Sequence, residues 1–211
     1  MDRIRRYPDL ASGHRADLDA VLDAAAVGTL ATVVDGLPWV VPMLYARDGD
    51  RIVLHGSTGA GALRHVAAGA PVAFSVTMLD GIVVADTLFD STANYRSAVV
   101  RGCLTEFCGG GAVEALDLMS DALIPGRSSE VRTHTKKELA ATLAMALSIE
   151  PGCWTVKMRD APPPEPSAAS GEWAGVIPLR TVAGAPEPAP WVGEDVQEPE
   201  SVRRLVAGAR V

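Results

Sequence analysis

Residues 28–36 read GTLATVVDG, a run of small and β-branched residues that ends in an Asp-Gly pair. Such a run is typical of a β-strand, and Asp-Gly is a common hairpin turn. A second β-rich stretch follows from Pro38 to Tyr45. A third runs from Arg51 to Leu54, after the turn at residues 48–50. Three short strands joined by tight turns predict an antiparallel meander at the start of the fold.

More strands than helices are expected in the rest of the first 160 residues. The apolar periodicity predicts further strands at 70–78, 82–85, 97–102 and 149–158, and helices at 17–26, 61–68, 112–123 and 135–147. Strands and helices do not alternate as they do in parallel α/β folds. The sequence therefore predicts a mainly β protein of the α+β class, a small barrel with peripheral helices.

The composition changes at residue 161, where proline, glutamate, alanine and glycine become frequent. Such a segment cannot build a core of its own. It nevertheless carries Trp173, Ile177, Leu179 and Trp191, whose apolar area is costly to leave in water. We therefore divide the chain into a domain at 1–160 and an extension at 161–211, which we expect to wrap over the barrel or a partner subunit.

Charge and composition exclude several classes of protein. The net charge of -7 over 211 residues argues against a general nucleic-acid binder. We expect no membrane span, because no apolar run approaches the roughly 18 residues that one needs. No apolar stretch typical of a secretory signal follows the first residues, so a cytoplasmic protein is expected. The three cysteines are Cys103, Cys108 and Cys153, and without a paired CxxC spacing they predict free thiols.

A loop of small and hydroxyl residues follows the third strand. Residues 54–59 read LHGSTG, and a helical composition comes next. Ser57 and Thr58 offer hydroxyl groups, while Gly56 and Gly59 let the backbone come close to a ligand. The stretch therefore predicts a site for the phosphate of a nucleotide-like cofactor. The alternative is an ordinary strand-to-helix turn with a serine or threonine cap. The loop is not a Walker A motif, because no Gly-Lys-Ser/Thr follows.

The order of several motifs resembles a known family. The motifs lie at residues 28–32, 38–42, 54–59, 63–65, 80–81, 94–100 and 150–157. Together they resemble the pyridoxamine 5'-phosphate oxidase-like, FMN-binding split barrels, most closely the branch with the nitroimidazole-resistance proteins. The likeness spans residues 25–160. It implies a six-stranded split barrel that forms a homodimer, with one FMN at each end of the interface.

The resemblance also implies contacts with the cofactor. They would come from His55, Gly56, Ser57, Thr58, Asn94, Tyr95, Arg96, Ser97 and Trp154. Arg96 suits a phosphate because its guanidinium is a charged, two-pronged donor, although a surface ion pair is the alternative. Trp154 or Trp173 could stack on the flavin or the substrate. The implied function is a flavin-dependent oxidoreductase acting on a small substrate, with aromatic or nitro-aromatic compounds as one option. No catalytic residue is identified.

Two positions depart from the family pattern. Ala62 stands where family members often carry a lysine, and Asp90 lies where many have a histidine. A missing charge-assisted contact weakens FMN binding by about 1.5–3 kcal/mol. We therefore keep a haem-dependent enzyme, a cofactor-free enzyme and a non-catalytic binder of flavin or another small ligand as alternatives. With haem, His55, His65 or His134 could ligate the iron, since histidine is the usual proximal ligand. Taken singly, each of them is more simply explained by an ordinary structural role.

Overall fold

The computed structural model describes residues 7–167 and 171–208. The helices are α1 (Arg15–Leu22), α2 (Gly61–Ala67), α3 (Gly110–Leu123), α4 (Lys136–Ala141) and α5 (Glu200–Gly208), with 3-10 turns η1 (Pro8–Leu10) and η2 (Arg127–Ser129). The strands are β1 (Ala11–Ser12), β2 (Val27–Val34), β3 (Leu37–Asp48), β4 (Arg51–Ser57), β5 (Pro71–Val84), β6 (Thr92–Glu106), β7 (Thr142–Ser148), β8 (Trp154–Arg159) and β9 (Gly175–Pro178).

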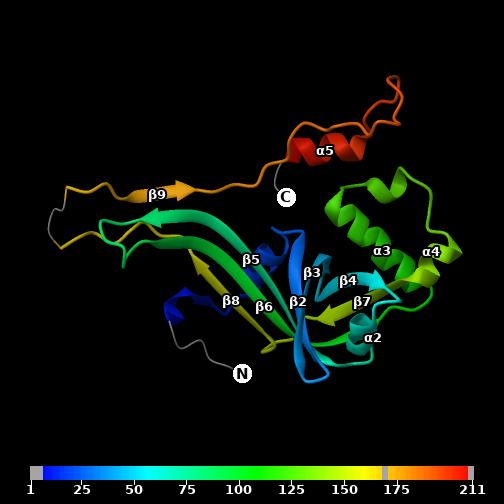
Figure 1. Ribbon diagram of the computed structural model, residues 1–211, viewed down its shortest axis with the longest axis horizontal. Coiled ribbons are helices and arrows are strands. Elements are labelled where there is room, and N and C mark those ends of the chain that lie inside the picture. The colour runs from blue at the N-terminus through cyan, green and yellow to red at the C-terminus, as the bar shows by residue number, and fades with distance from the viewer. Residues whose placement is uncertain (1–6, 168–170, 209–211) are drawn as a thin grey trace.

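Six antiparallel strands close into a ring in the order β2, β3, β4, β7, β6 and β5, with β5 returning to β2 (Figure 1). Strands β5 and β6 extend beyond the ring. Their outer halves form a projecting two-stranded extension, which we call the arm. There β8 pairs with β6, β1 with β8, and β9 with β5. This ring with an open extension confirms the prediction of a six-stranded split barrel.

Strand alternation builds the core. Leu30, Leu54, Phe74, Val100 and Met145 point into the barrel and are fully buried. The Phe74 ring meets Tyr45 edge-on, with 5.0 Å between the ring centroids. A second, smaller cluster lies outside the ring, where α3 packs on the outer faces of β3, β4 and β7. The barrel wall between β3 and β7 is therefore covered on both faces.

One predicted helix is wrong in its second half. A helix was expected over 135–147, but α4 ends at Ala141 and residues 142–148 form β7. The run from Leu143 to Leu147 has helix-forming composition. Its pairing with β4 and β6 buries Leu143, Met145 and Leu147 in the core, and this packing overrides the local propensity.

Strand boundaries also differ from the prediction, most clearly in two places. The strand expected over 149–158 begins only at Trp154, because residues 150–153 form a turn that contains Gly152 at a φ of +86°. The stretches at 70–78 and 82–85 belong to one strand, β5, and the expected turn between them is a register shift at residues 79–81. The prediction of free thiols is confirmed for all three cysteines.

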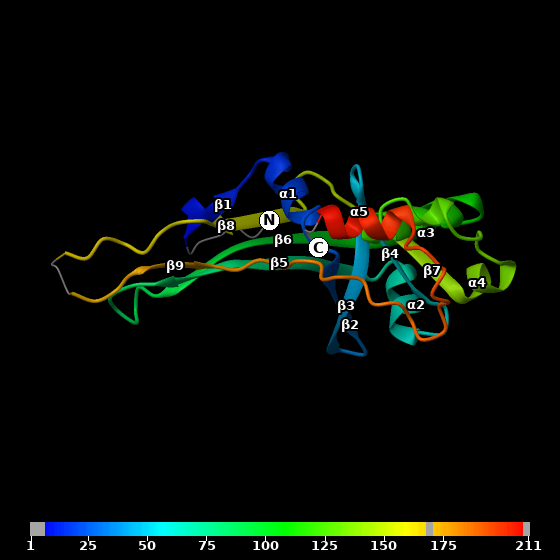
Figure 2. The same cartoon turned by 90° about the horizontal axis from the view of Figure 1, so that it is seen from above.

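The C-terminal extension returns along the molecule (Figures 1 and 2). Its strand β9 pairs with the arm through β5, and after an irregular stretch α5 comes to lie near α3. Trp173 and Trp191 are both largely exposed in the single chain. No helix in the part of the chain that the structure describes is long and apolar enough to cross a membrane.

Candidate functional site

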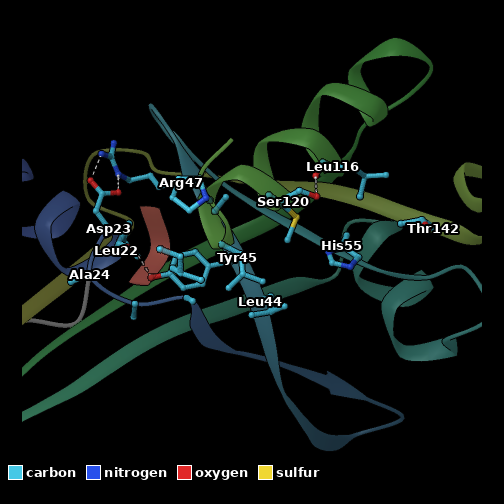
Figure 3. A pocket seen from close by; sticks show the side chains of 18 of the residues that line it. Leu22, Asp23, Ala24, Leu44, Tyr45, Arg47, His55, Leu116, Ser120 and Thr142 are labelled. Carbon is cyan, nitrogen blue, oxygen red and sulfur yellow. Dashed lines mark hydrogen bonds and ion pairs between the residues drawn. The ribbon is translucent and has the colours of Figure 1, made fainter. Parts of the chain in front are cut away.

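A pocket of about 520 Å³ lies between the outer face of the barrel and α3 (Figure 3). Its walls come from the α1–β2 loop, β3, β4, β7, α3, the loop before α4, and α5. The large apolar side chains in these walls are Leu22, Leu44, Leu116, Met119, Leu123 and Leu205. The polar contributions include two imidazoles, His55 and His134. A mostly apolar pocket with a few polar groups is typical of a small-molecule or cofactor site.

His55 reaches this pocket because of strand alternation. In β4, Ile52 and Leu54 point into the barrel, so Val53 and His55 point outward toward α3. Partial desolvation lowers the pKa of His55 and favours the neutral ring, although the side chain is still accessible to solvent. The described residues give its nitrogens neither a hydrogen bond nor an ion pair. A neutral imidazole with a free nitrogen is the form that ligates a metal.

His134 lines the pocket from the loop before α4, and its side chain already contacts a carboxylate. Its Nε2 is 3.2 Å from Oδ1 of Asp117 on α3. A capping box fixes the following turn: Glu138 N donates to Thr135 Oγ1, and Thr135 N donates to Glu138. Arg132 also donates two hydrogen bonds to the Glu138 carboxylate, and these lower the pKa of Glu138. The position of the His134 side chain is thus fixed by its contact with Asp117 and by the capped turn that follows it.

The third candidate histidine is outside the pocket. His65 on α2 lies with Nε2 3.1 Å from the carbonyl oxygen of Val33 on β2, a contact that ties the helix to the neighbouring strand. This is an ordinary structural role for a histidine on a helix surface.

Two side-chain contacts fix the part of the pocket wall that the α1–β2 loop forms. Tyr45 donates a hydrogen bond of 2.6 Å to the Leu22 carbonyl, and burial raises the pKa of this phenol. Arg47 grips the Asp23 carboxylate with Nε at 2.7 Å and Nη2 at 2.5 Å. The pocket therefore has a fixed wall on this side.

In the predicted phosphate loop, several hydrogen-bond donors already bind acceptors within the chain. The Thr58 N–H donates to the Ala141 carbonyl at 3.1 Å, and the Thr58 hydroxyl donates to the same oxygen at 3.3 Å. The Gly59 N–H donates to Ser57 Oγ, and the Ala60 N–H to the Ser57 carbonyl. These bonds shape a tight turn. The role of the loop in holding a phosphate stays a prediction.

One cation beside this loop was missed. A second hollow, of about 350 Å³, is lined by Thr58, Arg64, Ala67, Ala68, Glu106 and Leu143. Among the residues described, none forms an ion pair or hydrogen bond with the Arg64 guanidinium. Arg64 follows Ala62 by two positions, so it supplies a positive charge close to where family members often carry lysine. The sequence signal was present in the Leu63-Arg64 pair.

The predicted residues on β6 have partners within the arm. Asn94 is buried, and its Oδ1 accepts hydrogen bonds from Arg159 Nη1 and the Ala161 N–H. Arg96 forms a two-pronged ion pair with Asp80, at 2.9 and 2.7 Å. Ser97 makes one long hydrogen bond, of 3.5 Å, to the Lys157 carbonyl.

Their distance from the loop follows from the strand itself. Arg96 is ten residues before Glu106, which lines the second hollow, and a strand advances about 3.3 Å per residue. Roughly 30 Å of strand therefore separates them. Half-buried Tyr95 lies on the same arm. Half-buried Trp154 on β8 pairs with Val100 and packs against the barrel core. Within one chain the structure does not bring these residues to the loop, and their cofactor roles stay predictions.

Comparison with solved structures identifies two similar chains. The FAD and heme binding protein from Mycobacterium smegmatis is 44% identical, with a TM-score of 0.90, over 93% of this chain and 97% of that one. The flavocytochrome Anf3 from Azotobacter vinelandii is 31% identical, with a TM-score of 0.88, over 96% and 94%.

A more distant structure shares the fold alone. This protein, described as a 5-nitroimidazole antibiotic resistance protein from Bacteroides thetaiotaomicron, is 15% identical with a TM-score of 0.58, over 70% of this chain and 85% of that one. No curated protein matches the chain. The family model of pyridoxamine 5'-phosphate oxidase matches residues 14–153, which include the whole six-stranded ring. The chain therefore belongs to the pyridoxamine 5'-phosphate oxidase family.

Proposed function

We propose that this protein is a redox protein that binds a flavin and a haem, with the haem in the pocket under α3. The observation that carries the proposal is His55, whose imidazole faces a pocket of about 520 Å³ and has no hydrogen-bond or ion-pair partner among the residues described. The two similar chains, described as a FAD and heme binding protein and as a flavocytochrome, support the same pair of cofactors.

The side chains present fit a haem better than a bare metal ion. No group of three or more histidine, cysteine, aspartate or glutamate residues gathers to hold a metal in residues 7–167 and 171–208. A metal at His55 would therefore bring most of its ligands with it, as haem iron does. Leu44, Leu116 and Met119 offer apolar contacts to a flat macrocycle. The pocket volume lies within the roughly 300–1,000 Å³ of ligand sites.

Of the three candidate histidines, His55 is the iron ligand in this proposal. Asp117 engages Nε2 of His134, so His134 could ligate only through Nδ1, whereas both nitrogens of His55 are without a partner among the residues described; His65 lies outside the pocket. A bound haem supplies one-electron and oxygen chemistry, and a flavin exchanges a hydride or single electrons. Around the haem the apolar side chains would reduce the access of water, and Asp117 would hold Nε2 of His134 in its present contact.

The flavin belongs beside the β4–α2 loop in this proposal. Arg64 offers its phosphate a free guanidinium, and Ser57 and Thr58 shape the turn next to it. The resemblance to split barrels predicts FMN, whereas the more similar of the two chains is described as binding FAD. Mass spectrometry of the cofactor released by denaturation distinguishes the two. Arg64→Ala should lower the flavin content, with Arg101→Ala, an exposed arginine on β6, as control.

A second copy of the chain completes the proposal. The outer face of the β2–β3 hairpin is apolar and exposed through Val27, Val33, Val40 and Leu44. Large exposed apolar faces mark interaction sites, and a homodimer is what the split-barrel resemblance implies. A dimer would also offer the arm residues Asn94 and Arg96 to the partner's flavin.

An absorbance spectrum of the purified full chain tests the haem. A Soret band is expected together with the paired near-ultraviolet and blue absorbance bands of a flavin. His55→Ala should lose the Soret band and keep the flavin. His65→Ala and His134→Ala, which remove an imidazole elsewhere, should keep both. A normal Soret band in His55→Ala would show that another residue ligates the iron.

Turnover separates an enzyme from a carrier. Reduction by NADH or NADPH, followed by reoxidation with oxygen or a nitro-aromatic compound, tests the small aromatic substrate that the resemblance implies. Spectra that respond to reductant without any turnover would instead indicate a protein that stores or transfers electrons.

A further inference from the structure

The C-terminal helix α5 contributes to the pocket from outside the barrel. Leu205 of α5 is one of the pocket's apolar lining residues. Val202, Leu205 and Val206 are half-buried, whereas Arg203 and Arg204 are exposed. The spacing of the half-buried positions puts them on one face of the helix. This face is turned toward the protein, and α5 is therefore a wall of the pocket.

A polar contact fixes the first turn of α5. Ser201 is 1% exposed. Its N–H donates to Glu130 Oε1 at 2.9 Å, and its hydroxyl makes a short hydrogen bond to Glu130 Oε2. Arg127 Nη1 lies 3.4 Å from the same carboxylate. Both oxygens of Glu130, just after η2, are therefore committed to holding the helix.

Little else holds α5 in place. Residues 179–199 contain no helix or strand and are almost entirely exposed. Among the residues described, their backbone hydrogen bonds are local, apart from the bond from the Leu179 N–H to the Asp80 carbonyl on the arm. A flexible connection of this kind does not orient a helix. The position of α5 thus depends on the Ser201–Glu130 contact and the apolar face.

We propose that α5 is part of the binding site: Leu205 contacts the molecule in the pocket, and the Ser201–Glu130 pair positions Leu205. Detachment of α5 would then open the pocket. The inference depends on the proposed function for the identity of the molecule, haem, but the wall would act on any apolar occupant. In this view residues 179–199 are a tether, and Leu205 helps to determine what the pocket accepts.

Hydrogen exchange of the ligand-free full chain tests the positioning pair. Ser201→Ala and Glu130→Gln should speed amide exchange in residues 200–208 by about tenfold, the effect of losing a hydrogen bond to a charged group. Glu194→Gln is the matched control, because it removes a tail carboxylate that has no partner among the residues described. Unchanged exchange in both test variants would contradict the positioning role.

Haemin loss to excess apomyoglobin tests the contact with the occupant. Leu205→Ala, Ser201→Ala and Glu130→Gln should each release haemin several-fold faster than the wild type, and Glu194→Gln should release it at the wild-type rate. If Ser201→Ala and Glu130→Gln speed amide exchange in residues 200–208 but release haemin at the wild-type rate, α5 is not part of the site.

The two proposals fail in different ways. A wild-type chain that takes up no haemin contradicts the proposed haem function, while exchange still decides whether the pair holds α5. The wall is then tested with 8-anilinonaphthalene-1-sulfonate, a dye that fluoresces in apolar pockets. Ser201→Ala and Glu130→Gln should bind more dye than wild type if α5 covers the pocket. Equal fluorescence in all three proteins would contradict it.

Discussion

At the residue scale, Gly28 has a steric reason to be glycine. A Cβ at this position would lie 2.2 Å from Cζ of Phe74, whose ring is fully buried against Tyr45. We expect Gly28→Ala to destabilise the protein by about 1–3 kcal/mol, because the ring must move within a packed core. Urea unfolding measures the change. Gly13→Ala, where a Cβ meets nothing within 4 Å, should have little effect.

Variants of Arg96 and Asp80 can show whether Arg96 serves an ion pair or a bound cofactor. Each side chain is about one-third exposed, so a coupling of at most about 1 kcal/mol is expected. Arg96→Ala and Asp80→Ala should lower stability by similar amounts, and the double variant should lose less than their sum. Urea unfolding of the three variants gives the coupling. If Arg96→Ala alone also loses flavin, Arg96 serves the cofactor, as the resemblance implies.

Single residues show where prediction from the sequence ends. The motif order identified His55 and the loop after it, because both follow from the strand that precedes them. The pairing of Arg96 with Asp80 depends on the register between β5 and β6 across the shift near Gly81, which no local pattern specifies. Likewise, the spacing of His55 and His134 in the chain gives no sign that they share a pocket.

At the scale of elements, α5 should respond to acid through Glu130. Hydrogen bonds from Ser201, together with Arg127, lower the pKa of Glu130 below its ordinary value of 4.5. A lowered carboxyl pKa stabilises the docked helix fully above that ordinary value. The stabilisation is lost as the pH falls through the folded-state pKa. Exchange in residues 200–208, corrected for intrinsic rates, should therefore speed up as the pH falls below 4.5. Glu130→Gln should abolish this response.

The α4–β7 segment shows why element types can be mispredicted. The helix begins where it was predicted, at a capping box formed by Thr135 and Glu138. Nothing local marks Ala141 as the end, since the apolar residues that follow suit helix and buried strand alike. The barrel determines that this segment is a strand, because β7 supplies the backbone hydrogen bonds that β4 and the end of β6 need.

At the scale of the whole molecule, the split barrel was predictable and the pocket was not. The split barrel follows from motifs whose order along the chain is characteristic, and the ring of six strands agrees. The pocket is assembled from the α1–β2 loop, β4, α3 and α5, which are far apart in the sequence. Such a site depends on how the peripheral helices pack on the barrel. The tail was expected to wrap over the barrel or a partner subunit, but no helix was predicted within it.

The last prediction concerns the second copy. Val40 is 61% exposed at the centre of the apolar outer face of the β2–β3 hairpin. A buried, unpaired charge is costly, so Val40→Glu should shift the protein from dimer to monomer in sedimentation velocity. Val182→Glu changes an equally exposed valine in the tail and should leave the dimer intact. If the arm of one subunit completes the flavin site of the other, the Val40→Glu monomer should also lose flavin while keeping its Soret band. A monomeric wild type would contradict the interface.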